Sequence, residues 1–138
     1  MADTPNTAAC LLALPDGKFV FERRTKDAPV SASMLSLFGG HLEVGESDLH
    51  AVRREMSEET SLDISDLHVK HIGRFRSAIR KADMDLYIAH VTSQNFKVFE
   101  GERPEVYGID EVLSRGDLDP DARQVITKYK ELADAKHN

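Results

Sequence analysis

Two apolar segments on either side of a turn near the start of the chain predict a β-hairpin. Residues 8–14 form an apolar run that ends in the turn signal Pro15-Asp16-Gly17. Residues 18–24 follow, with Phe19 and Phe21 on one face. Two such segments on either side of a proline–glycine turn are typical of paired antiparallel strands.

Further apolar stretches predict more strands along the chain. They lie at residues 34–38, 67–78, 83–92 and 105–107, with a turn at Lys81-Ala82-Asp83. The first of these runs directly into Gly39-Gly40.

The spacing of apolar residues changes to that of a helix after Asp48. Leu49, Val52 and Met56 recur three and four residues apart, which predicts an amphipathic helix over residues 48–60. Ser47 is a suitable N-cap for this helix.

The end of the chain predicts two more helical segments. Residues 109–113 indicate a short helical turn, and Pro120 suits the first position of a last helix. We expect four residues of that helix to face the core: Val125, Ile126, Tyr129 and Leu132.

The order of these elements predicts the fold class. Strands, a helix, more strands and a final helix indicate a mixed β-sheet with helices packed on it, an α/β or α+β fold. The length suits a single domain over residues 1–138, with residues 1–7 as a polar arm.

Composition narrows the classes of function. The net charge is −6 and there is no block of five basic residues, so we expect no nucleic-acid partner. No segment is long and apolar enough to span a membrane, and the N-terminus lacks the pattern of a secretory signal. The single cysteine, Cys10, cannot form an internal disulfide, which favours a cytoplasmic location.

Three glutamates, Glu55, Glu58 and Glu59, fall in one sector of the predicted helix. Glu59 lies beside the apolar stripe, where a carboxylate is costly unless a positive group joins it. Carboxylates at this spacing suit Mg²⁺, which also binds substrate phosphates. The alternative is a solvated acidic face, which is common on surface helices. Gly39-Gly40 favours a site, because glycine lets the backbone approach a ligand closely.

The same region resembles the signature of a known family. Gly40, Glu46 and the run from Arg54 to Leu62 match the Nudix box, G-x5-E-x7-R-E-U-x-E-E-x-G-U, where U is aliphatic. The resemblance implies a Nudix-type α/β/α sandwich. Ser61 stands where the box has a glycine that ends the helix. We expect this to cost about 1 kcal/mol of stability rather than activity.

The resemblance also implies roles for individual residues. The expected metal ligands are Glu55, Glu58 and Glu59, the Gly40 carbonyl, and Glu100 from a later loop. The four glutamates of this set are also the expected catalytic residues. Either Glu55 or Glu100 would accept the proton of the attacking water. Glu46 and Arg54 resemble the pair that bridges loop and helix, so their expected role is structural support.

The family hydrolyses nucleoside diphosphates linked to another group, by attack of water on a pyrophosphate phosphorus. The resemblance therefore implies Mg²⁺ as cofactor, with Mn²⁺ as a substitute, and a nucleotide as substrate. Residues 63–86 lack the proline and tyrosine that mark two subclasses, so by elimination we favour a nucleoside triphosphate or related nucleotide. Four arginines are candidates for the distal phosphates: Arg23, Arg24, Arg74 and Arg76.

Two further expectations concern assembly and an alternative function. Dimers are common in this family and among soluble proteins, so a homodimer is one expectation. A non-catalytic domain that binds a nucleotide as a regulator is the alternative to an enzyme.

Overall fold

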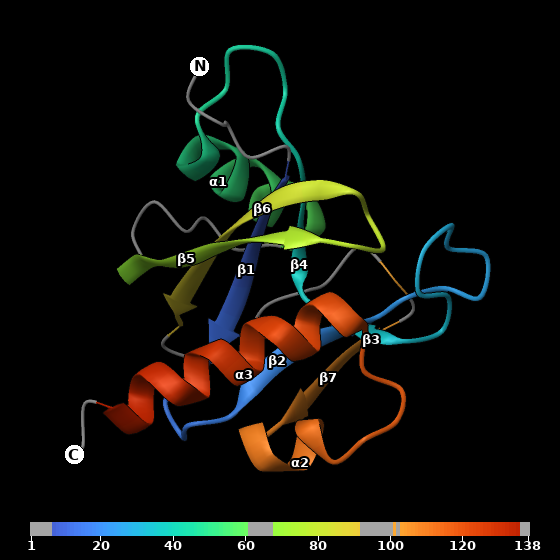
Figure 1. The fold of residues 1–138 in the computed structure, drawn as a ribbon, viewed down its shortest axis with the longest axis vertical. Coiled ribbons are helices and arrows are strands. Elements are labelled where there is room, and N and C mark those ends of the chain that lie inside the picture. Colours follow the sequence, from blue (N-terminus) through green and yellow to red (C-terminus); the bar gives the residue numbers. More distant parts are fainter. Residues whose placement is uncertain (1–6, 61–67, 92–100, 102, 136–138) are drawn as a thin grey trace.

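The computed structural model describes residues 7–60, 68–91, 101 and 103–135. Its β-sheet lies between helix α1 (Asp48–Glu59) and helix α3 (Pro120–Ala135), and a short helix α2 (Ile109–Leu113) lies beside α3 (Figure 1). The predicted α/β/α sandwich is confirmed.

The sheet is mixed, as predicted. Its seven strands are β1 (Thr7–Ala13), β2 (Phe19–Arg23), β3 (Leu35–Ser36), β4 (Phe38–His41), β5 (His68–Ser77), β6 (Ala82–His90) and β7 (Arg103–Tyr107). The main order is β3-β2-β1-β6-β5, with β4 paired to β1 and β7 paired to β2. The β1–β6 pair is parallel and the other pairs are antiparallel.

Strand β1 is buried on both faces because helices cover both sides of the sheet. Leu11 belongs to the core under α3, whereas Cys10 and Leu12 belong to the core under α1. This alternation follows from the two-residue period of a strand. The predicted hairpin is confirmed, with Phe19 and Phe21 both in the α3 core.

Helix α1 begins and ends close to the predicted residues. The Ser47 hydroxyl accepts a hydrogen bond from the His50 backbone N–H at 3.2 Å, which satisfies one of the unpaired donors of the first turn. Val52 and Met56 are fully buried against the sheet. Thr60 leaves the helical conformation at the C-cap, while its N–H and hydroxyl both donate to the Met56 carbonyl. Ser61 lies outside the described residues.

The turn between β5 and β6 lies earlier than predicted. Residues 78–81 form it, and Lys81 has the positive φ of 53°. Ala82 pairs with Ser77 and is buried, so it belongs to β6. The predicted turn at Lys81-Ala82-Asp83 is therefore wrong in two of its three residues.

Helix α3 begins as predicted. The Asp119 carboxylate accepts from the Ala122 backbone N–H at 3.0 Å and so caps the helix, with Pro120 as its first residue. Tyr129 packs edge-on against Phe19, with ring centroids 5.5 Å apart.

The prediction that Leu132 faces the core is wrong. This side chain is 43% exposed, because it lies one turn beyond the last packed aromatic residue of α3. None of the helices among the described residues has the length and apolar character needed to cross a bilayer.

Candidate active site

An ion pair ties the loop before α1 to the helix. Arg54 donates from Nε to Glu46 Oε2 at 2.7 Å and from Nη2 to Glu46 Oε1 at 3.0 Å. Nη2 also donates to the His41 carbonyl, and Glu46 accepts from the Glu43 N–H. The Arg54 hydrogen bonds lower the pKa of Glu46 to about 2, and the same contacts raise the pKa of Arg54. The expected supporting role of this pair stays a prediction.

The free edge of the Arg54 guanidinium faces two further carboxylates. Nη1 donates to Glu55 at 2.8 Å and to Glu58 at 3.3 Å. Glu55 is largely buried, with its side chain 14% exposed, whereas the Glu58 side chain is 58% exposed. Arg54 therefore offsets the repulsion between neighbouring acids on α1.

Glu59 is held differently, by the backbone of β4. Its side chain accepts from the Gly39 N–H at 2.9 Å, and the residue is only 3% exposed. Gly39 has a φ of +150°, and a Cβ at this position would lie 2.2 Å from the Ala8 carbonyl oxygen. Only glycine allows β4 to lie this close to β1 and still bind the buried carboxylate.

Gly40 brings β4 close to α1. A Cβ at Gly40 would lie 2.5 Å from the carboxyl carbon of Glu55. The two glycines lie inside β4, where Gly40 pairs with Ala8, and β4 continues past them to His41. The predicted strand at 34–38 is interrupted, and forms β3 and β4.

A pocket of about 530 Å³ opens over these groups. Gly40, Glu55 and Glu59 line it, whereas Glu58 does not. Glu100 lies outside the described residues, so its expected role stays a prediction. Several residues that we did not predict also line the pocket: Glu22, Arg80, Asp119 and Asp121. Their positions carry no signature in the sequence, apart from the cap at Asp119.

The described residues contain no group of three or more His, Cys, Asp or Glu side chains already arranged to hold a metal ion. Arg54 binds Glu55 and Glu58, whereas the Gly39 N–H binds Glu59. The available donors are nevertheless carboxylate and carbonyl oxygens, which are the ligands that Mg²⁺ prefers.

Of the four arginines predicted as phosphate ligands, only Arg24 lines the pocket. Arg24 lines the pocket, where it donates from Nε to the Val30 carbonyl at 2.8 Å and lies 3.7 Å from Glu22. Arg74 and Arg76 do not line it, and Arg76 pairs with Asp83 at 3.3 Å. Only Arg24 of the four reaches both Glu22 and the pocket.

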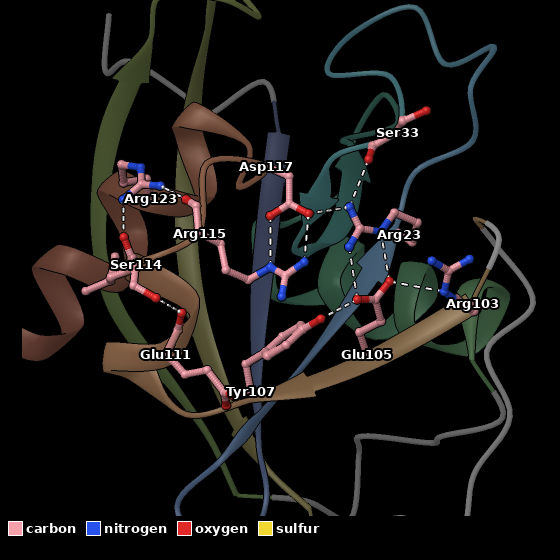
Figure 2. A network of polar contacts seen from close by, with 11 residues as sticks. Arg23, Ser33, Arg103, Glu105, Tyr107, Glu111, Ser114, Arg115, Asp117 and Arg123 are labelled. Atoms are coloured by element: carbon pink, nitrogen blue, oxygen red, sulfur yellow. Dashed lines mark hydrogen bonds and ion pairs between the residues drawn. The ribbon is translucent and has the colours of Figure 1, made fainter.

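Arg23 is the centre of a separate polar network (Figure 2). It donates to Glu105 at 2.8 and 2.9 Å, to Asp117 at 2.9 Å and to the Ser33 carbonyl at 2.9 Å. Hydrogen bonds from Arg23 lower the pKa of Glu105 to about 2. Arg23 is buried and does not line the pocket, so it is not a phosphate ligand.

The structure is therefore an α/β/α sandwich in which Glu55 and Glu59 of α1 pack on the glycine-containing strand β4. The family model of the NUDIX domain matches residues 3–129. The chain therefore belongs to the NUDIX domain family. The predicted family, with its hydrolase activity on phosphoric anhydride bonds, is confirmed at this level.

Solved structures share this fold at low sequence identity. The MutT protein of Methanosarcina mazei is 18% identical, with a TM-score of 0.77, and the match covers 96% of this chain and 99% of that one. The MutT NUDIX hydrolase of Burkholderia pseudomallei is 21% identical, with a TM-score of 0.75 and coverage of 92% and 98%. The NUDIX domain of Shewanella oneidensis NrtR, solved with ADP ribose, is 19% identical, with a TM-score of 0.73 and coverage of 96% and 90%. No curated protein matches the sequence.

Proposed function

We propose that the protein is a Mg²⁺-dependent pyrophosphohydrolase that cleaves a nucleoside triphosphate or a related nucleotide by attack of water on a pyrophosphate phosphorus. One observation carries the proposal: Glu55, Glu59 and Gly40 line the same pocket as Arg24. Acidic groups for a cation and a cationic side chain for a phosphate therefore face one cavity. We also propose that residues 1–138 form one domain, since the family model spans most of them.

The residues that would hold the metal are Glu55, Glu58, Glu59, Glu100 and the Gly40 carbonyl. When bound, Mg²⁺, or Mn²⁺ in its place, would neutralise the phosphates and make a bound water more acidic. To serve as ligands, Glu55 and Glu58 would have to give up their contacts with Arg54, whose two bonds to Glu46 would still hold the loop in place.

Arg24 is the proposed ligand of a distal phosphate. Its Nε bond to the Val30 carbonyl fixes the guanidinium at the wall of the pocket. A guanidinium held in this way loses little conformational freedom when it binds a phosphate oxygen.

The proton acceptor for the attacking water is Glu55 or Glu100. Glu55 lines the pocket and is mostly buried, which suits a base that must meet a water beside the substrate. Glu100 remains the second candidate.

The alternative is a regulatory domain that binds a nucleotide without cleaving it. The contacts of Arg54 with Glu55 and Glu58 favour this alternative if they persist when a nucleotide and Mg²⁺ are bound. The NUDIX domain of NrtR, solved with ADP ribose, has the same fold.

Phosphate or pyrophosphate release from a nucleotide panel, with and without Mg²⁺, tests the proposal. The panel holds canonical and oxidised nucleoside triphosphates, ADP-ribose, dinucleoside polyphosphates and nucleotide sugars. We expect metal-dependent cleavage of one class, and losses of at least about 100-fold in Glu58→Gln and Glu59→Gln. Tight binding without cleavage by the wild type would instead support the regulatory alternative.

A further inference from the structure

Basic residues gather on strand β5 and on the turn that follows it. Residues 68–82 contain no aspartate or glutamate, although the whole chain has 24 acidic and 18 basic residues. Four lysines and arginines of this stretch are exposed, and we call them the basic strip: Lys70, Arg74, Arg76 and Lys81. Because salt screens charges beyond about 8 Å, the strip presents a positive field to a nearby partner despite the net charge of −6.

Strand β5 lies beside β6 at one end of the sheet (Figure 1). In the part of the chain that the structure describes, β6 is its only partner. An edge strand of this kind presents a row of backbone N–H and C=O groups on its outer side, where another strand can pair with them. The register shifts between His71 and Gly73, so the regular part of this edge covers residues 73–77.

Strand β7 shows that this fold protects another edge in a different way. It pairs with one described strand, β2, but it has only five residues and contains Pro104, which lacks an N–H donor. Strand β5 has ten residues and no proline. Its backbone can therefore accept a further strand, and the charges of the basic strip decide which strand that is.

The basic strip disfavours pairing with a second copy of β5. Arg74 lies opposite Asp85 of β6. Arg76 lies opposite Asp83, two residues further along, so both arginines point to the same face of the sheet. A second β5 would bring its own lysines and arginines beside them, and like charges on neighbouring strands repel. A strand with carboxylates at alternate positions would instead form ion pairs with both arginines.

Arg76 keeps most of its guanidinium accessible to such a strand. Its side chain is 61% exposed, although Nη1 lies 3.3 Å from Asp83 and Nη2 donates to the Lys81 carbonyl at 3.1 Å. These two contacts fix the direction of the side chain along the edge. A guanidinium has five N–H donors, so Arg76 can bind a second carboxylate without giving up the first.

We propose that β5 is a docking edge for an extended acidic segment of a partner protein, which adds to the sheet as a further strand beside residues 73–77. The backbone of the segment pairs with the outer side of β5, and its carboxylates, two residues apart, bind Arg74 and Arg76. This function is separate from the proposed hydrolysis, because neither arginine lines the pocket.

Fluorescence anisotropy of a labelled peptide tests the proposal without nucleotide or metal. The probe is a fluorescein-labelled peptide of about eight residues that alternates glutamate and threonine, and its counterpart has lysine in place of glutamate. We expect the wild type to bind the acidic peptide at least about tenfold more tightly than the lysine peptide. Equal binding of the two peptides, or no binding of either, overturns the proposal.

Arg76→Glu and Arg103→Glu form a matched pair of variants, since the two arginines lie in different edge strands. Their side chains are 61% and 60% exposed, and they lie 3.3 and 3.2 Å from their acidic partners. Arg76→Glu should weaken binding of the acidic peptide at least about fivefold, whereas Arg103→Glu should change it less than about twofold. Equal losses would show attraction by overall charge alone and would overturn the docking edge.

A proline version of the acidic peptide separates strand addition from attraction between charges. Proline in place of each threonine keeps every glutamate but removes the N–H donors at those positions. We expect its binding to be at least about tenfold weaker, and equal binding of the two acidic peptides contradicts strand addition. Oligothymidylate of similar length is the last probe. If it binds more tightly than the acidic peptide, the basic strip is a nucleic-acid contact and the proposal is wrong.

Discussion

Gly40 and Glu55 lie so close together that a methyl group on Gly40 would fall 2.5 Å from the Glu55 carboxyl carbon. The contact joins strand β4 to helix α1 at the wall of the pocket. A side chain at Gly40 would therefore displace the carboxylate that we propose as metal ligand or base.

We expect Gly40→Ala to lower kcat by about 100-fold while the protein stays folded, because the displaced atoms are the end of a flexible side chain. Steady-state kinetics and a thermal melt would check this. Gly116→Ala is the control, since a Cβ there meets nothing within 4 Å. Wild-type activity in Gly40→Ala would show that the position of Glu55 is not critical.

Gly39→Ala should act on stability instead. Its φ of +150° disfavours alanine, and the new Cβ would lie 2.2 Å from a backbone oxygen of β1 that cannot move independently. We expect a loss of about 3 kcal/mol or more in the free energy of unfolding. Urea denaturation measures it, and a loss below 1 kcal/mol would contradict the close approach of β4 and β1.

The ion pair of Glu46 with Arg54 predicts a dependence of stability on pH. The pKa of Glu46 is about 2 in the folded protein against the usual 4.5. Its stabilising contribution is therefore complete above pH 4.5 and is lost as the pH falls toward 2. The difference in unfolding free energy between wild type and Glu46→Gln should be constant above about pH 5 and shrink on acidification. A difference that stays the same from pH 7 to pH 2 would contradict the role of this ion pair.

Arg23 should matter for folding and not for catalysis. Arg23→Met leaves Glu105 and Asp117 without their shared partner in a largely buried network, which should cost about 3–5 kcal/mol. Arg103→Met, which removes a side chain that is 60% exposed, should cost less than about 1 kcal/mol. Denaturant melts of the two variants compare them directly, and similar losses would contradict the central role of Arg23.

Arg24→Ala should raise KM by about tenfold with a smaller change in kcat, since the loss of one phosphate contact weakens substrate binding. Arg76→Ala, outside the pocket, should leave both constants unchanged. A wild-type KM in Arg24→Ala would remove Arg24 from the proposed phosphate site.

Local patterns in the sequence predicted α1 and the hairpin, because these depend on neighbours within a few residues. The pairing of Glu46 with Arg54 followed only from the resemblance to the Nudix box. The ion pair of Arg80 with Asp121 in the wall of the pocket could not be predicted. Arg80 meets Asp121 across 41 positions in the chain, and that contact depends on how the β5–β6 turn docks on α3. Arg23 and Arg24 were equivalent in sequence, and only the fold assigns one to a buried network and the other to the pocket.

The buried position of Cys10 allows opening of the protein to be measured by thiol labelling. This single cysteine lies in β1, which pairs with β2, β4 and β6, and it is 1% exposed. Burial raises the pKa of the thiol to about 12, so the folded protein presents almost no thiolate at neutral pH. A thiol reagent can therefore modify the molecule only while the sheet is open. The rate of labelling then reports how often the sheet opens, and no probe has to be introduced.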